Sequence, residues 1–200
     1  ADAKVAAESL ADGAMYNTGQ SCCSVERIYV HERLHDAFVE HFLATVAGFK
    51  CGDPMDAATY IGAITRAPQL DVLEAQVADA RARGATLRCG GHRLPGPGNW
   101  FAPTVFTGVS HAMDLMREES FGPIIGIQKV ASDDEAVALI DALRQQPLAP
   151  TARALLLMAQ GMQLFRQGRH TELTQAYAEV LSLLVAGEPP HAAGKIALSA

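Results

Sequence analysis

The stretch Val25-Glu26-Arg27-Ile28-Tyr29-Val30 is rich in β-branched and aromatic residues, and this composition predicts a β-strand. Beyond it, apolar residues recur every three or four positions, which predicts an amphipathic helix over residues 34–47 that Gly48 helps to end. The same criteria predict helices over residues 5–14, 68–84 and 133–143 (capped by Ser132) and strands over residues 85–88, 101–106 and 124–130. Strands that alternate with helices favour an α/β domain with a mostly parallel sheet.

The composition of the chain changes near Gln145, which marks the end of this predicted domain over residues 1–145. Two prolines indicate a linker over residues 146–151. Two apolar stripes follow and predict a C-terminal α-helical hairpin over residues 152–186. We expect an irregular tail over residues 187–200. The abrupt change also fits a fused or truncated gene product.

Composition and charge exclude several classes of protein. The hydrophobic fraction of 49% and the charged fraction of 19% are typical of a globular chain and argue against disorder. A net charge of −6, with no basic stripe, argues against a nucleic-acid partner. The longest apolar run, residues 154–159, is too short to span a membrane, and residues 1–4 lack the layout of a signal peptide. We therefore expect a cytoplasmic protein.

The four cysteines are Cys22, Cys23, Cys51 and Cys89. None forms a CxxC pair, which argues against a structural zinc site, and a bridge between the adjacent pair would be strained. Free thiols are therefore expected. A thiolate can attack a carbonyl inside a dry pocket that supplies oxyanion donors, and Gly19 would let the backbone approach a substrate closely. The alternative is that each cysteine is a small buried apolar residue.

Two motifs decide between these alternatives. The run Asn17-Thr18-Gly19-Gln20-Ser21-Cys22 resembles the cysteine signature of NAD(P)-dependent aldehyde dehydrogenases. The run Glu118-Glu119-Ser120-Phe121-Gly122-Pro123 is similar to the second signature of that family. Between them, Gly90-Gly91 and Ala102-Pro103-Thr104-Val105-Phe106 resemble family segments in the right order. The resemblance covers residues 2–142 and implies part of the aldehyde dehydrogenase catalytic domain.

This resemblance implies a role for three residues. Cys22 would attack the aldehyde to form a thiohemiacetal and then a thioester, while its backbone N–H would belong to the oxyanion hole. Glu119 would accept hydrogen bonds from the ribose hydroxyls next to the nicotinamide, and Phe121 would pack near the nicotinamide ring. The implied cofactor is NAD or NADP, the implied substrate is a small-molecule aldehyde, and no metal is implied.

Several family features are not recognisable in the sequence. The general base of the family lies in a Glu-Leu-Gly-Gly segment upstream of the cysteine, and Glu8 is too near Cys22 to replace it. The glycine-rich turn of a Rossmann nucleotide domain, the oxyanion-hole asparagine and the C-terminal oligomerisation strands are also not recognised. We therefore expect an incomplete form that keeps the nucleophile and is weakly active or inactive.

The C-terminal hairpin suggests a different class of function, a non-catalytic scaffold or interaction protein. Residues Gly161, Phe165, Gly168, Ala176 and Tyr177 resemble a single tetratricopeptide repeat. One repeat cannot bury its own apolar face, so the stripe must pack on another surface. The sheet of the preceding domain is the favoured surface, and a protein partner or a second copy of the chain is the alternative.

A second alternative is a zinc peptidase, because His31-Glu32-Arg33-Leu34-His35 fits the HExxH pattern. That site requires both histidines on one face of a helix. His31 directly follows the predicted strand, so we expect it to precede the helix and to point away from His35. Solvated histidines around a helix start are the favoured interpretation.

Overall fold

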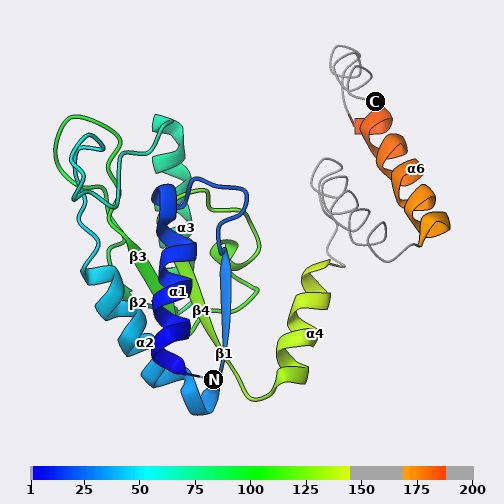
Figure 1. Cartoon of the computed structure of the whole chain (residues 1–200), viewed down its shortest axis with the longest axis horizontal. Coiled ribbons are helices and arrows are strands. Elements are labelled where there is room, and N and C mark those ends of the chain that lie inside the picture. Colours follow the sequence, from blue (N-terminus) through cyan, green and yellow to red (C-terminus); the bar gives the residue numbers. More distant parts are fainter. Residues whose placement is uncertain (1, 145–168, 188–200) are drawn as a thin grey trace. The chain divides into compact units, whose positions relative to one another are not determined.

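The computed structural model describes residues 2–144 and 169–187, which belong to two compact units, Ala1–Leu143 and Arg144–Ala200. The described elements, in chain order, are α1 (Ala3–Met15), η1 (Tyr16–Gly19), β1 (Arg27–His31), α2 (Glu32–Ala47), α3 (Ala67–Ala82), β2 (Thr86–Cys89), β3 (Thr104–Thr107), η2 (Asp114–Met116), β4 (Ile124–Val130), α4 (Asp133–Arg144) and α6 (His170–Gly187) (Figure 1). The first unit contains strands and helices in alternation and has the predicted α/β class.

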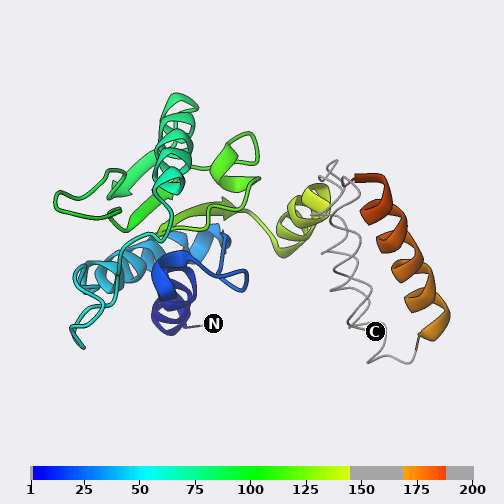
Figure 2. The ribbon, with the colours of Figure 1, turned by 90° about the horizontal axis from the view of Figure 1, so that it is seen from above.

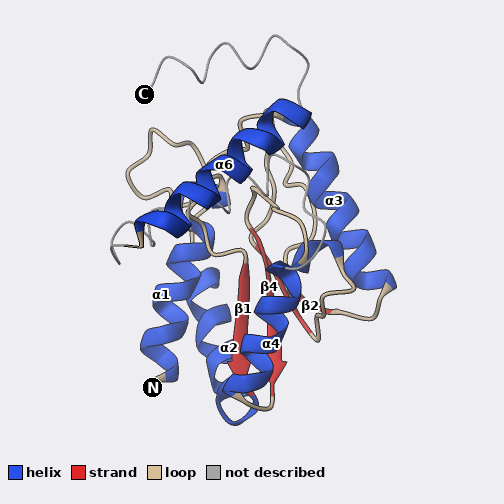
Figure 3. Cartoon of the chain, turned by 90° about the vertical axis from the view of Figure 1, so that its right-hand side faces the viewer, coloured by secondary structure: helices blue, strands red, loops and turns tan. Residues whose placement is uncertain are grey.

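The four strands form one sheet in the order β1-β4-β3-β2 (Figures 1 and 3). Strand β4 pairs in parallel with both β1 and β3, whereas β2 pairs with β3 in the antiparallel direction. The prediction of a mostly parallel sheet is therefore confirmed. Because β1 and β4 are neighbours, the segments that precede these two strands meet at the same edge of the sheet.

Helices cover both faces of this sheet (Figure 2). On one face, α1 and α2 bury Ala11 and Phe42 against Ile125 and Ile127 of β4. On the other face, α3 buries apolar residues that include Leu73 against Ile124 of the same strand. Neighbouring positions in β4 thus serve opposite cores, as the two-residue period of a strand requires. The apolar residues that recur every three or four positions along α3 form its buried face: Leu70, Leu73, Val77 and Ala80.

Local signals explain where the helices begin. The Asp2 carboxylate accepts hydrogen bonds from the N–H groups of Lys4 and Val5, at 2.9 and 3.3 Å, and caps α1. At α4, the Ser132 hydroxyl accepts from Glu135 N at 3.1 Å, and the Glu135 carboxylate accepts from the N–H of residue 131 at 2.7 Å. The bond to the Ser132 hydroxyl confirms Ser132 as the predicted cap, and the bond from residue 131 holds the chain just before it.

Two strands begin at least two residues later than predicted. Strand β1 begins at Arg27 and not at Val25, because the Val25 N–H donates to the carbonyl of Gly13 at the end of α1 (3.0 Å). Strand β3 begins at Thr104 and not at Phe101, because Pro103 has no N–H to give to a ladder. Each strand therefore starts where its backbone becomes free to pair.

The predicted helical hairpin falls partly outside the described residues. Helix α6 contains the second apolar stripe, but the predicted linker, the first helix of the hairpin and residues 188–200 lie outside the structure's description. The hairpin and its resemblance to a tetratricopeptide repeat stay predictions. Over residues 2–144 and 169–187, no helix combines the length and the apolar character that a membrane crossing requires.

We expect the substitution Leu73→Ala to lower the free energy of unfolding by about 2 to 5 kcal/mol, because Leu73 is fully buried in the α3 core and its removal leaves a cavity. The neighbouring substitution Val72→Ala is the control, since Val72 is 43% exposed on the same helix. Urea denaturation of both variants checks the expectation. Equal losses in the two variants would contradict the assignment of this core.

Candidate active site

The segment that follows α1 is a left-handed turn. Asn17, Thr18 and Gly19 have φ angles of 50°, 59° and 69°, in the region that L residues rarely adopt. The Asn17 side-chain amide donates to the carbonyl of Gln20 at 2.9 Å and closes the turn. Asparagine is one of the few residues that tolerate this conformation, so the sequence of the turn suits its backbone.

Gly19 lies directly against the backbone of Gly122. A Cβ atom built on Gly19 would lie 2.1 Å from the Gly122 carbonyl oxygen and 2.5 Å from its carbonyl carbon. No side chain fits at that distance, and the positive φ of Gly19 also favours glycine. This close approach joins the Asn17–Cys22 segment to the Glu118–Pro123 segment.

The same turn is anchored on its other side to the segment before α3. The Thr18 hydroxyl accepts a hydrogen bond from the N–H of Gly62 at 2.9 Å. The Gln20 side chain accepts from the N–H of Thr65 at 2.8 Å and donates to the carbonyl of Ala63 at 3.4 Å. These bonds connect residues more than forty positions apart in the chain and fix the turn from two directions.

Arg27, the first residue of β1, and Glu26 just before it hold the Glu118–Pro123 segment. The Arg27 guanidinium donates to the carbonyls of Met116 and Glu118, at 2.5 and 3.1 Å. The Glu26 carboxylate accepts from the N–H of Ser120 at 3.0 Å. Burial raises the pKa of the Glu26 carboxyl, although the backbone N–H of Ser120 and the charge of Arg27 partly oppose this rise.

Glu119 and Phe121 flank the buried Ser120 and are themselves exposed. Phe121 has a φ of 48°, which turns the chain sharply between these two side chains. Gln69, in the first turns of α3, donates its amide to the carbonyl of Ser120 at 2.6 Å and supports the turn from that helix. The turn therefore presents a carboxylate and an aromatic ring on the surface.

Side chains of both motifs line one cavity of about 530 Å³. It is lined by Asn17, Gln20, Ile64, Thr65, Arg66, Gln69, Val72, Glu119 and Phe121. The lining thus combines residues of both motifs with the start of α3. Two of the three predicted site residues, Glu119 and Phe121, contribute to it. The sequence analysis did not find Arg66 and Gln69, because no local pattern shows that α3 starts beside the two motifs.

Cys22, the third predicted site residue, does not line this cavity. It lies in the turn between η1 and β1, and its thiol is exposed and free. Within residues 2–144, the Cys22 thiol is thus open to solvent. In that part of the chain the backbone N–H of Cys22 has no protein acceptor, so it is available to an oxyanion.

The remaining thiols differ from Cys22 in their surroundings. The Cys23 sulfur lies 3.9 Å from the Cys22 sulfur, and the hydrogen bond between the two thiols is the main cause that raises the pKa of Cys23. Burial raises the pKa of Cys51 and of Cys89, which are half-buried. These three thiols are thus disfavoured as thiolates at neutral pH.

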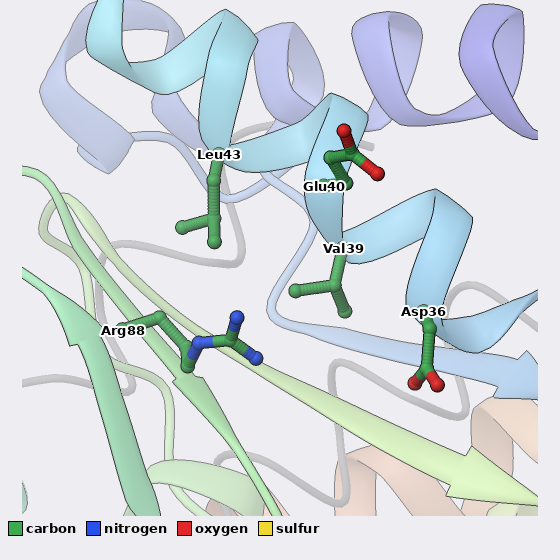
Figure 4. Close-up of a pocket in the computed structure, with 5 residues that line it drawn as sticks. All are labelled: Asp36, Val39, Glu40, Leu43 and Arg88. Carbon is green, nitrogen blue, oxygen red and sulfur yellow. The ribbon is translucent and has the colours of Figure 1, made fainter.

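A second cavity, of about 400 Å³, lies between α2 and β2 and is lined by Asp36, Val39, Glu40, Leu43 and Arg88 (Figure 4). The carboxylates come from α2, and the Arg88 side chain extends toward that helix from the sheet. None of the predicted site residues lines this cavity.

The HExxH histidines have separate surroundings. His31 is the last residue of β1, as expected, and its ring nitrogen caps α2 by accepting from the N–H of Arg33 at 3.2 Å. His35 is buried on α2, and its Nδ1 lies 2.8 Å from a carboxylate oxygen of Asp36. The expectation that His35 is solvated is therefore wrong. Among the residues that the structure describes, no three histidine, cysteine or acidic side chains are grouped closely enough to hold a metal ion.

Comparison with known proteins extends these observations. Residues 1–145 match the sequence model of the aldehyde dehydrogenase family. The chain is 41% identical over 142 residues to a protein of Mycolicibacterium paratuberculosis named succinate-semialdehyde dehydrogenase, NADP(+). That match covers 71% of this chain and 30% of the relative. The chain thus spans about three-tenths of the length of the curated relatives that it matches.

The chain is also similar in structure to part of several solved dehydrogenases. The chain is similar to a succinate-semialdehyde dehydrogenase from Burkholderia pseudomallei, with 37% identity and a TM-score of 0.68 over 70% of this chain and 29% of that one. It is also similar to an NAD-dependent aldehyde dehydrogenase from Sinorhizobium meliloti, with 38% identity and a TM-score of 0.67 over 70% of this chain and 28% of that one.

We expect Gly19→Ala to lower the free energy of unfolding by about 2 kcal/mol more than Gly84→Ala. Both glycines have a positive φ, so both substitutions strain the backbone, but a Cβ on Gly84 would meet nothing within 4 Å. Only Gly19→Ala also forces apart the two motifs. Chemical denaturation of the two variants checks this difference, and equal stability would show that the contact with Gly122 is not close.

We expect a limiting dose of iodoacetamide to alkylate Cys22 before the other three cysteines. Cys22 is exposed, whereas the pKa of each other thiol is raised. Peptide mapping by mass spectrometry measures the order of labelling. Alkylation of Cys51 or Cys89 at the same rate would contradict the described arrangement of this loop.

Proposed function

The chain belongs to the aldehyde dehydrogenase family, and we propose that its α/β unit supplies the nucleophile and part of the cofactor site for the oxidation of an aldehyde to a carboxylic acid. The observation that carries this proposal is the contact between Gly19 and Gly122. It joins the loop of Cys22 to the turn of Glu119 and Phe121, so a nucleophile and a cofactor-binding surface come from one structural unit.

The cavity beside this contact suits the nicotinamide end of NAD or NADP. Its volume of about 530 Å³ is within the usual range of small-molecule sites. The Glu119 carboxylate can accept from two ribose hydroxyls, and the Phe121 ring offers a flat apolar surface. When bound, the cofactor supplies the two-electron oxidant. The relatives' names include both NADP(+) and NAD, so we propose either dinucleotide.

Cys22 is the proposed nucleophile. Its thiolate would attack the aldehyde carbon and form a carbon–sulfur bond, while the carbonyl electron pair moves onto the oxygen. The backbone N–H of Cys22 would donate to that oxyanion and stabilise its charge. After oxidation, the sulfur of Cys22 would hold the acyl group as a thioester until water cleaves it and restores the thiol.

The substrate is proposed as a small aldehyde. The relatives described above include proteins named succinate-semialdehyde dehydrogenase, so succinate semialdehyde is the first compound to test. A cytoplasmic location stays a prediction of the sequence.

Succinate semialdehyde carrying ¹³C in its aldehyde carbon tests the nucleophile. We expect a thiohemiacetal carbon signal by NMR with the unaltered chain and with Cys23→Ser, and the loss of this signal in Cys22→Ser. Cys23→Ser is the matched control because Cys23 is also exposed and adjacent in sequence. A signal that survives in Cys22→Ser and disappears in Cys23→Ser would reject Cys22 as the nucleophile.

Binding of nicotinamide mononucleotide tests the cofactor surface. We expect Glu119→Gln to weaken binding by about tenfold, because a charge-assisted hydrogen bond contributes roughly 1.5 to 3 kcal/mol. Glu118→Gln is the control, since it removes an exposed carboxylate from outside the cavity in the same segment. Isothermal titration of both variants measures the difference. Equal affinities would contradict the role proposed for Glu119.

A further inference from the structure

The strongest unexplained feature of the site is the carboxylate of Glu26, immediately before β1. It accepts a hydrogen bond from the N–H of Ser120 at 3.0 Å, and the backbone N–H of Phe121 is near enough to lower the pKa of the same carboxyl. The N–H of this turn thus bonds to a side chain from a segment more than ninety positions earlier in the sequence.

This arrangement has an energetic cost. Glu26 is partly buried, and the loss of hydration raises the pKa of its carboxyl, with a further contribution from the negative charge of Glu119. The N–H groups of Ser120 and Phe121 and the charge of Arg27 compensate only in part. At neutral pH the ionised side chain therefore reduces stability, because the folded state would bind a proton more tightly than the unfolded chain.

The geometry of the turn explains why an acceptor is needed at this place. Phe121 has a φ of 48°, a conformation that is unfavourable for a residue with a side chain. The buried Ser120 between Glu119 and Phe121 has a hydroxyl with no partner among the described residues, so it does not hold the turn. Within residues 2–144, the hydrogen bonds to the turn come from Glu26, Arg27 and Gln69.

We propose that Glu26 is a positioning residue of the cofactor site, whose carboxylate holds the turn of Ser120 and Phe121 so that the Glu119 carboxylate and the Phe121 ring face the cavity. This inference rests on the proposed function for its cofactor. Its structural part, the restraint of the turn, stands on the hydrogen bonds alone. The ionised Glu26 side chain thus lowers the stability of the fold while it fixes the cofactor surface.

Amide hydrogen exchange tests the restraint directly. We expect exchange at Ser120 and at the adjacent Phe121 to be about tenfold faster or more in Glu26→Ala, which leaves the Ser120 N–H without its acceptor. Glu26→Gln keeps the size and one acceptor oxygen, so its exchange should be intermediate. Glu118→Gln, the matched control, should leave both rates unchanged. Unchanged exchange in Glu26→Ala, or in Glu26→Gln should the alanine variant fail to fold, would overturn the proposal.

Two further measurements separate positioning from a role in stability alone. The melting temperature of Glu26→Gln should equal or exceed that of the unaltered chain, although its turn exchanges faster. Its affinity for nicotinamide mononucleotide should fall several-fold. A fall in melting temperature with unchanged affinity would overturn the positioning role.

A failure of the proposed function can be distinguished from a failure of the Glu26 proposal. If Glu119→Gln binds nicotinamide mononucleotide as well as the unaltered chain does, the cofactor assignment fails, and the functional part of the Glu26 proposal fails with it. Faster exchange in the Glu26 variants would then show that only the restraint of the turn is correct.

Discussion

The backbone contact between Gly19 and Gly122 is the constraint on which the candidate site depends. It permits a left-handed turn after α1 to touch the segment before β4 without an intervening side chain. Any larger residue at position 19 would force the two segments apart, because its Cβ atom would lie 2.1 Å from the Gly122 carbonyl oxygen. The loop of Cys22 and the surface formed by Glu119 and Phe121 would then no longer share a fixed geometry.

The topology of the sheet creates the conditions for this contact. Cys22 precedes β1, whereas Glu119 and Phe121 precede β4, and these two parallel strands are neighbours. Because parallel strands start at the same edge, two segments almost a hundred residues apart in the sequence arrive side by side. The side chains of Glu26 and Arg27 then join the edge by bonding to the backbone of the second segment. The sheet sets where the segment of Glu119 and Phe121 lies, and these polar contacts set the conformation of its backbone.

The sequence was sufficient for most of the fold because the relevant signals are local. Strand β4 has its predicted bounds, and the buried face of α3 follows from the spacing of its apolar residues. The start of β3 was wrong because the absence of an N–H in Pro103 outweighs the apolar character of Phe101. The buried state of His35 was missed because tertiary packing, and not local polarity, decides which face of α2 is covered.

The site was predictable only as far as its motifs extend. Glu119 and Phe121 follow from a resemblance, and the structure brings them into one cavity. The roles of Gln69 and Glu26 could not be foreseen, since each acts on the backbone of Ser120 from a distant part of the chain. The exposure of Cys22 was likewise not visible in the sequence, because it depends on how the loop after η1 leaves the sheet edge.

The most direct test of the central claim is a measurement of intermolecular nuclear Overhauser effects between NAD and the chain. If Gly19 and Gly122 bring the nucleophile loop and the cofactor surface together, the nicotinamide protons should show contacts both to the ring of Phe121 and to the Cβ protons of Cys22. Contacts to Phe121 with none to Cys22, or contacts to neither residue, would contradict the account.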